Sequence, residues 1–291
     1  MSTGLVQAVD LGGTKTAIAL VDETGRIHEK LKIPAAKDFA ASVGQIVSRL
    51  GELRPSACAL GVIVPGIHDA SNGTVWAPNL WGKDFHPLRA ELEQRLGIPV
   101  AIGSDRTGSV LAEQWLGVAR GLRHVIFVAV GTGIGVGILC DGRPVEGAHG
   151  IAGAAGWMTV AGPWKPAYAE RGGWETIAAG PALARYAEME SAESVAAAAR
   201  DGNPKARVAI ARVASWLALG IGNLIAVLDP EIVVLGGGVM QASDLMLASI
   251  RKMALMQTQP MAARQVRIEL TALGEDAGLL GAARLAWNAR V

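Results

Sequence analysis

Apolar residues recur along the first half of the chain in short runs separated by glycine and proline. The run over residues 5–22 predicts two strands joined by a Gly-Gly turn, and a further turn follows at residues 23–25. Apolar positions at helical spacing predict a helix over residues 38–53. The remaining pattern predicts, in order, a buried strand at 57–65, a helix near 87–96, a strand at 99–105 and a helix at 108–117. Strands that alternate with helices predict an α/β sheet architecture.

The second half of the chain begins with the same layout. Residues 124–142 predict strand, glycine-rich turn and strand, again with a Gly-Thr pair in the turn. A loop is expected at 147–173, helices over 174–229, a strand at 231–238 and a helix over 277–289. This repeat predicts two related lobes, a small N-terminal one (1–117 plus 278–291) and a larger one (118–277).

Composition narrows the class of protein. With 291 residues, the chain is longer than most single domains, and 51% apolar with 18% charged residues is typical of a compact enzyme. A net charge of +1 provides no electrostatic attraction for nucleic acid or a membrane surface. The start of the chain does not resemble a signal peptide, and the apolar stretches 124–140 and 213–228 are shorter than the ~20 residues that span a bilayer. We therefore expect a cytoplasmic protein whose partner is a small molecule.

Cysteine and histidine suggest no metal or redox centre. Cys58 and Cys140 lie in apolar runs, which favours reduced core cysteines. The isolated histidines are predicted to be surface or loop residues, and they are His28, His68, His86 and His124.

Three glycine clusters follow predicted strands. They are Gly12-Gly13-Thr14, Gly131-Thr132-Gly133 and Gly236-Gly237-Gly238. Glycine lets backbone N–H groups approach an anion closely, so three such turns indicate a nucleotide site. For the first cluster alone, general turn chemistry favours a simple tight hairpin. None of the three matches a Walker loop or a dinucleotide-binding fingerprint, and an actin-type ATPase fits better.

An ordered set of motifs makes this fold specific. In order they read DLGGTKTA (10–17), GVIVPG (61–66), APNLWG (77–82), SDRTGSVLAEQ (104–114), VGTGIGVGI (130–138), LDPEIVVLGGGV (228–239) and LGEDAGLLGAA (273–283). This set, which covers nearly the whole chain, resembles the ROK family of sugar kinases. The resemblance implies a two-lobed actin-like ATPase (ribonuclease H-like) fold with an interlobe cleft. It also implies ATP- and Mg²⁺-dependent phosphorylation of a hexose or sugar-like polyol at a primary, 6-position type hydroxyl, and a homodimer.

The resemblance also implies roles for individual residues. The first phosphate motif comprises Asp10, Gly12, Gly13, Thr14 and Lys15, with the aspartate facing Mg²⁺ and phosphate. The second phosphate hairpin comprises Gly131, Thr132 and Gly133, and the adenosine motif comprises Gly236, Gly237 and Gly238. On the sugar side, Gly66 matches the turn beside the substrate and Asn79 matches a ligand of a sugar hydroxyl.

Asp105 matches the catalytic base of the family. It follows an apolar strand and precedes a helix, so its carboxylate is expected at the sheet edge where α/β proteins bind ligands. A base there can accept the proton of the attacking hydroxyl during phosphoryl transfer. The alternative is that Asp105 is only the N-cap of the following helix.

The chain departs from the family at its zinc motif. The positions of the histidine and cysteine ligands hold Trp157, Pro166, Tyr168 and Gly173, which provide no set of four zinc donors. We therefore expect no zinc. An aromatic cluster of Trp157, Trp164, Tyr168 and Trp174 is a hypothesis for what replaces the metal, and the alternative is that these are separate core or surface residues.

A second departure concerns the substrate. Ala154, after Gly153, replaces a sugar-binding Glu or His, while Glu175 keeps the partner carboxylate and Ser104 stands for the usual Asn. The loss of a hydrogen-bonding group alters substrate specificity, so the sequence favours an amino sugar, another modified sugar or a cyclic polyol as the substrate. Trp157 either stacks on an apolar ring face or packs in the core.

Two further questions stay open at this point. Polyphosphate is not excluded as a donor in place of ATP. The runner-up function is a catalytically weak sugar sensor with the same cleft. A predicted hairpin at the start of the sequence, in place of a DNA-binding module, and the joint presence of Asp10 and Asp105 favour the kinase.

Overall fold

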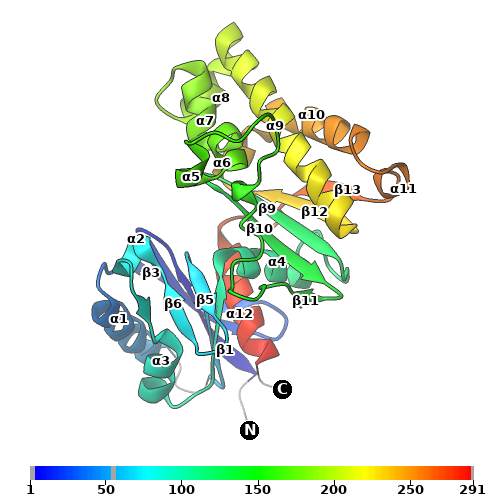
Figure 1. The fold of residues 1–291 in the computed structure, drawn as a ribbon. Helices are drawn as coiled ribbons and strands as arrows, with labels where there is room; N and C mark the ends of the chain where they lie inside the picture. Colours follow the sequence, from blue (N-terminus) through cyan, green and yellow to red (C-terminus); the bar gives the residue numbers. More distant parts are fainter. Residues whose placement is uncertain (1–3, 54–56, 290–291) are drawn as a thin grey trace. The chain divides into compact units, whose positions relative to one another are not determined.

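The computed structural model describes residues 4–53 and 57–289, which form two compact units (Figure 1). The first unit contains Met1–Gly121, Glu146–Ile151 and Ala272–Val291. The second contains Leu122–Val145 and Ala152–Thr271. Each unit has its own sheet and its own hydrophobic core.

The first unit is organised around a five-stranded sheet of order β3-β2-β1-β4-β8. Its strands are β1 (Leu5–Leu11), β2 (Lys15–Asp22), β3 (Ile27–Pro34), β4 (Leu60–Val64) and β8 (Val100–Ser104). Strands β1, β4 and β8 run parallel, and β2 and β3 extend the sheet as antiparallel strands. The sequence pattern missed β3 because it is an edge strand, with polar residues at His28, Glu29 and Lys30.

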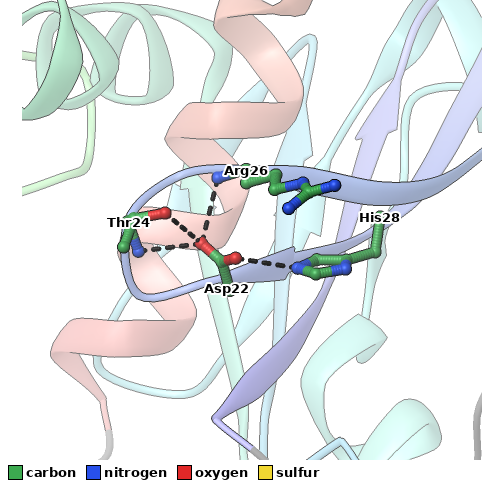
Figure 2. A network of polar contacts seen from close by, with 4 residues as sticks. All are labelled: Asp22, Thr24, Arg26 and His28. Carbon is green, nitrogen blue, oxygen red and sulfur yellow. Dashed lines mark hydrogen bonds and ion pairs between the residues drawn. The ribbon is translucent and has the colours of Figure 1, made fainter.

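The turn between β2 and β3 is closed by one aspartate (Figure 2). Asp22 Oδ1 accepts hydrogen bonds from the Thr24 N–H, the Thr24 hydroxyl and the Arg26 N–H, and Oδ2 lies 2.7 Å from Nε2 of His28. Slight desolvation raises the pKa of Asp22, but the hydrogen bonds from Thr24, His28 and Arg26 outweigh it and hold the pKa well below its usual range. The turn expected at 23–25 is therefore confirmed, with Gly25 in the left-handed region at φ +85°.

Helices cover both faces of this sheet. They are α1 (Phe39–Glu52), α2 (Pro78–Trp81), α3 (Leu88–Leu96), α4 (Asp105–Leu116) and α12 (Ala277–Asn288). Helices α1 and α3 bury leucine, isoleucine and valine against one face, and α4 and α12 pack mainly through alanine on the other. Helix α12 approaches closely because Gly61 in β4 lacks a side chain, and a Cβ there would lie 1.8 Å from the Ala282 carbonyl.

A small antiparallel sheet joins the first unit beside β8. Its strands are β5 (Ile67–Asp69), β6 (Thr74–Trp76) and β7 (Phe85–His86). The prediction that His68 is a surface residue is wrong, because only 5% of it is exposed. Burial, and then the nearby Arg89, lower the pKa of His68 to about 4, so its Nε2 accepts from the guanidinium of Arg89 at 3.2 Å.

The sheet of the second unit repeats the topology of the first. Its order is β11-β10-β9-β12-β13, formed by β9 (Val125–Val130), β10 (Ile134–Cys140), β11 (Arg143–Pro144), β12 (Ile232–Gly236) and β13 (Arg267–Leu270). Strands β9, β12 and β13 are parallel, and β10 and β11 are antiparallel additions. The internal repeat expected from the sequence is thereby confirmed. The prediction of core cysteines is wrong for Cys140, which is exposed at the end of β10, whereas Cys58 is half-buried.

Helices make up most of the second unit. They are α5 (Tyr168–Arg171), α6 (Gly173–Ala178), α7 (Gly180–Ala187), α8 (Ala192–Arg200), α9 (Pro204–Leu228), α10 (Ser243–Met256) and α11 (Pro260–Ala263). Short 3₁₀ helices occur at Ala155–Trp157, Gly238–Ala242 and, in the first unit, Gly274–Asp276. Within the part of the chain that the structure describes, α9 is the one helix long and apolar enough to cross a membrane by length and composition alone. It is instead a core helix, because Val213, Leu217 and Ile221 are buried among the neighbouring helices and sheet.

Candidate active site

The first glycine turn connects β1 to β2. The Gly12 N–H donates to the Lys15 carbonyl at 2.9 Å, and a Cβ on Gly12 would lie 2.7 Å from that oxygen, so the turn requires glycine there. Gly13 borders open space, and Thr14 and Lys15 are exposed. The turn therefore presents backbone and a lysine to solvent.

A lysine that the sequence analysis missed joins this turn to the predicted sugar segment. The Lys37 ammonium donates to the carbonyl of Gly13 and, at 3.5 Å, to the carbonyl of Asn79. Asn79 lies on α2 with its side chain exposed. Gly66 allows the chain to pass close to β6, since a Cβ there would lie 2.2 Å from the Trp76 carbonyl. No motif marks Lys37, because its partners are backbone atoms distant in sequence.

Two carboxylates lie at the same edge of the first sheet. Asp10 is near the end of β1 and Asp105 directly follows β8, and both strands run parallel to β4 between them. Desolvation, and then the negative charge of Asp105, raise the pKa of Asp10 to about 6. Desolvation also raises the pKa of Asp105, although Oδ1 accepts from the Arg106 N–H at 2.8 Å. Each carboxylate therefore holds a proton more tightly than a free aspartate does.

The structure answers whether Asp105 is a helix cap. Ser104 is the N-cap of α4, and its hydroxyl accepts from the Thr107 N–H at 3.2 Å. Asp105 is the first helical residue, and its desolvated carboxylate does not serve as the cap. The cap interpretation of Asp105 is wrong, so its carboxylate is available for chemistry. Ser104 is 7% exposed and engaged in the cap, and its role toward substrate remains a prediction.

Helix α12 positions Asp10. A Cβ built on Gly278, in the first turn of this helix, would lie 2.0 Å from Oδ2 of Asp10. Only glycine allows this approach, because any side chain at position 278 would meet the Asp10 carboxylate. The sequence pattern identified both segments but gave no sign that they touch.

In the second unit, the hairpin between β9 and β10 borders a cavity. The Gly131 N–H donates to the Gly133 carbonyl at 2.9 Å, and Thr132 is exposed. The cavity has a volume of about 480 Å³ and is lined by Gly131, Thr132, Gly180, Pro181, Ala184, Glu190, Ser191, Ala192, Glu193, Gly238 and Val239. This volume falls within the ~300–1,000 Å³ range of small-molecule pockets.

The third glycine cluster has two different roles. Gly237 has φ +92° and lies against β9, where a Cβ would be 2.4 Å from the Val130 carbonyl. A Cβ on Gly236 would be 2.5 Å from the ring of Phe127. Gly238 is the member of the cluster that lines the cavity. The first two glycines thus allow close packing, and the third leaves room beside the hairpin.

Two predicted substrate residues contact β10. The Gly153 carbonyl accepts from the Val136 N–H at 2.8 Å, and Gly153 has φ +80°. Glu175 Oε2 accepts from the Ile134 N–H at 2.9 Å. Both residues therefore attach the segment after the hairpin to its second strand.

The aromatic-cluster hypothesis is wrong, and the alternative of separate residues is confirmed. Trp157 and Trp164 are 57% and 60% exposed, whereas Tyr168 and Trp174 are buried. Trp174 donates from Nε1 to the Trp216 carbonyl at 2.9 Å and packs on Gly220 of α9. Among residues 4–53 and 57–289, no group of three or more His, Cys, Asp or Glu is placed to hold a metal ion. The expected lack of zinc stays a prediction.

Comparisons with known proteins give matches over nearly the whole chain. A model of the ROK family matches residues 6–289. A glucokinase from Streptomyces coelicolor is 33% identical, with 97% of this chain and 98% of that protein covered. The ROK hexokinase of Thermus thermophilus has a TM-score of 0.85 at 30% identity, covering 98% of both chains. The ROK family glucokinase of Streptomyces griseus, in complex with glucose and AMPPNP, has a TM-score of 0.79 at 30% identity, covering 98% and 100%.

These likenesses agree with the repeated topology of the two sheets. The fold is the two-lobed actin-like ATPase fold of those kinases. The chain therefore belongs to the ROK family.

Proposed function

We propose that this chain is an ATP-dependent sugar kinase in which Asp105 is the general base. The observation that carries the assignment is the Asp105 carboxylate, which follows the end of β8, is not used as a helix cap and interacts with Asp10 at the sheet edge. Family membership and the kinases named above support ATP as donor and a hexose as acceptor.

The proposed reaction is an in-line phosphoryl transfer. Asp105 accepts the proton of a sugar hydroxyl as its oxygen forms a bond to the γ-phosphorus of ATP. The bond between that phosphorus and the bridging β–γ oxygen breaks, and ADP leaves. Backbone N–H groups of the glycine turn between β9 and β10, which borders the cavity of the second unit, stabilise the charge on the phosphate oxygens. The raised pKa of Asp105 suits a base that must hold a proton briefly near neutral pH.

The residues present fit a magnesium ion. Mg²⁺ prefers oxygen ligands and is commonly held by one or two carboxylates together with substrate phosphates. Asp10, whose ionisation is disfavoured by desolvation and by Asp105, provides a carboxylate that a cation would stabilise. When bound, the ion neutralises charge on the phosphates.

We assign the cavity of the second unit to the nucleoside of ATP. It begins at the phosphate hairpin with Gly131 and Thr132 and continues past Gly238, where no side chain intrudes. Glu190 and Glu193 line this cavity, and their carboxylates can accept hydrogen bonds from the exocyclic amine of adenine.

The acceptor is assigned as a hexose or a close derivative, phosphorylated at a primary, 6-position type hydroxyl. Asn79 and Gly66 lie on the same unit as Asp105, and Lys37 connects Asn79 to the phosphate turn. Ala154 stands where relatives of the family have a sugar-binding Glu or His, so this chain lacks that sugar ligand. Trp157 is exposed, which excludes a core role for its indole and favours stacking on a ring face of the sugar. Amino sugars and cyclitols therefore belong among the substrates to be tested.

A coupled ADP-release assay across glucose, other hexoses, amino sugars and cyclitols tests this function. We expect ATP- and Mg²⁺-dependent turnover with at least one hexose-type substrate. Sugar binding with no turnover across the whole panel would contradict the kinase and favour the sensor.

Asp105→Asn tests the catalytic role directly. We expect kcat to fall by ~10²–10⁴-fold, because an amide cannot accept the proton, while the dissociation constant for ATP stays within about threefold. Asp84→Asn is the matched control, since Asp84 is an exposed aspartate of the same unit and should leave kcat unchanged. Near-normal turnover in Asp105→Asn would exclude Asp105 as the base.

A further inference from the structure

A small side chamber adjoins the cavity that we assign to the nucleoside. The chamber has a volume of about 120 Å³. It shares four lining residues with the larger cavity, and they are Ala192, Glu193, Gly238 and Val239. A Cβ on Gly238 would meet no atom within 4 Å, so this glycine leaves open space where the two cavities adjoin.

The chamber lies away from the phosphate hairpin. Gly131 and Thr132 of the hairpin line the larger cavity and not the chamber. The residues that line the chamber alone are Leu183, Ala196, Arg200, Gln241 and Ala242. With the phosphates at the hairpin, the base lies at the far end of the larger cavity. The ring that carries the exocyclic amine is the part of adenine most distant from the ribose, so the chamber lies beyond this amine.

The wall that α8 contributes is fixed at both ends of the helix. At its start, the Ser194 N–H donates to the Ser191 hydroxyl and the Ser191 N–H donates to the Ser194 hydroxyl, both at 3.1 Å. At its end, Arg200 donates from Nε and Nη2 to the two carboxylate oxygens of Asp244, at 2.9 and 2.7 Å. Nη2 of Arg200 also donates to the Gln241 carbonyl at 3.1 Å. The chamber is therefore formed before a ligand binds, as most small-molecule sites are.

The lining of the chamber suits a small apolar group beside an amine. Ala196 and Ala242 are buried and apolar. An apolar cavity of about 150 Å³ holds a benzene molecule, so about 120 Å³ is enough for an alkyl group of a few carbon atoms. Glu193 lies at the boundary with the larger cavity, and hydrogen bonds from its own N–H and from the Ser191 hydroxyl lower its pKa. Its carboxylate is therefore an ionised acceptor at neutral pH.

We propose that the side chamber is a subsite for a substituent on the exocyclic amine of the donor base, so that the protein uses N⁶-monoalkyl adenosine triphosphates as well as ATP. The one N–H of such an amine donates to Glu193, and the alkyl group enters the chamber. The transfer step is unchanged, since the sugar oxygen bonds to the γ-phosphorus, Asp105 takes the proton and the N⁶-alkyl ADP leaves. This inference rests on the proposed function, because it needs the nucleoside in the larger cavity.

Kinetics with N⁶-methyl-ATP and N⁶-ethyl-ATP as donors test the subsite, with the phosphorylated sugar measured by mass spectrometry. We expect KM for both analogues to stay within about threefold of KM for ATP, because each keeps one amine N–H and places its alkyl group in space that is already open. N⁶,N⁶-dimethyl-ATP has no amine N–H, so its KM should rise about tenfold through loss of the hydrogen bond to the charged Glu193.

Ala196→Leu fills the chamber without changing the lining of the larger cavity. We expect KM for N⁶-ethyl-ATP to rise at least about tenfold in this variant, while KM for ATP stays within about twofold. Ala197→Leu is the matched control, because Ala197 is exposed on the same helix, lines neither cavity and should leave both constants unchanged. If Ala196→Leu does not fold, Gln241→Phe replaces it, since Gln241 is an exposed residue of the chamber and the same selective change is expected.

Two results would overturn the inference. One is rejection of both N⁶-methyl-ATP and N⁶-ethyl-ATP by the wild-type protein under conditions in which it uses ATP. The other is an equal loss of ATP and N⁶-ethyl-ATP in Ala196→Leu, because the chamber would then hold part of ATP itself.

Calorimetric titration with ADP and N⁶-ethyl-ADP separates this inference from the proposed function, because it requires no turnover. Dissociation constants that agree within about threefold would support the subsite even if no sugar in the panel is phosphorylated. Binding of ADP but not of N⁶-ethyl-ADP would contradict the subsite alone. Absence of ADP binding would contradict the nucleotide assignment and, with it, the subsite.

Discussion

Asp10 is the residue at which stability and function oppose each other. Its pKa is raised to about 6 by desolvation and by Asp105, so the folded protein binds a proton there more tightly than the unfolded chain does. The stability that this proton contributes is complete below pH ~4 and is lost as pH rises through about 6. At neutral pH the ionised Asp10 therefore destabilises the ligand-free protein, which Mg²⁺ would relieve.

Asp10→Asn should accordingly stabilise the ligand-free protein at pH 7.5 by roughly 1–3 kcal/mol, because an amide does not carry the unfavourable charge. The gain should shrink toward zero near pH 4, where the native aspartate is protonated. Urea denaturation at the two pH values measures it, with turnover expected to be lost in the variant. Equal stability of the two proteins at pH 7.5 would argue against a strained carboxylate.

At the scale of elements, the region of the missing zinc motif is held by helix α6 on helix α9. One tryptophan provides this contact, since Trp174 fills the space left by Gly220 on α9. Trp157 belongs to a short 3₁₀ helix and lies mostly in solvent. Two aromatic residues of the same loop region therefore contribute very differently to folding.

Trp174→Ala should lower the free energy of unfolding by ~3–5 kcal/mol, because it leaves a cavity in the core. Trp157→Ala should change it by less than about 0.5 kcal/mol, since it removes an exposed side chain. Chemical denaturation followed by circular dichroism compares the two variants. A large loss in Trp157→Ala, similar to that in Trp174→Ala, would contradict this difference between the two tryptophans.

For the whole molecule, the repeated sheet topology gives each unit one glycine turn at the same place in its sheet. The turn between β1 and β2 corresponds to the turn between β9 and β10. Under the proposed function, the chain binds ATP, so ATP stabilises the folded state.

We expect ATP with Mg²⁺, at about 100 times its dissociation constant, to stabilise the protein by ~2.7 kcal/mol and to raise its melting temperature. Asp105→Asn should show the same rise, because Asp105 acts on the acceptor hydroxyl and not on the nucleotide. Differential scanning fluorimetry, with Mg²⁺ alone as the reference, measures the shift. Absence of any shift at saturating ATP would contradict the nucleotide assignment.

The sequence by itself determined the strand–turn–strand repeat that begins each half, the glycine turns and the place of Asp105 at a strand end. Hydrophobic periodicity and turn chemistry are local properties, so they can be read without knowing which segments meet. It could not show edge strand β3, whose residues are too polar for a strand pattern, or the burial of His68 under Arg89.

Only the tertiary structure decided which residues contact one another across long sequence separations. Gly278 against Asp10, Lys37 between Gly13 and Asn79, and Glu175 on Ile134 are all contacts of this kind. Each depends on the distance between two segments that are far apart in sequence, and no single residue type or spacing encodes that distance. For the same reason, tryptophans close in sequence were divided between core and surface. The burial of a side chain depends on the residues that it packs against in the fold, and not on its neighbours in the sequence.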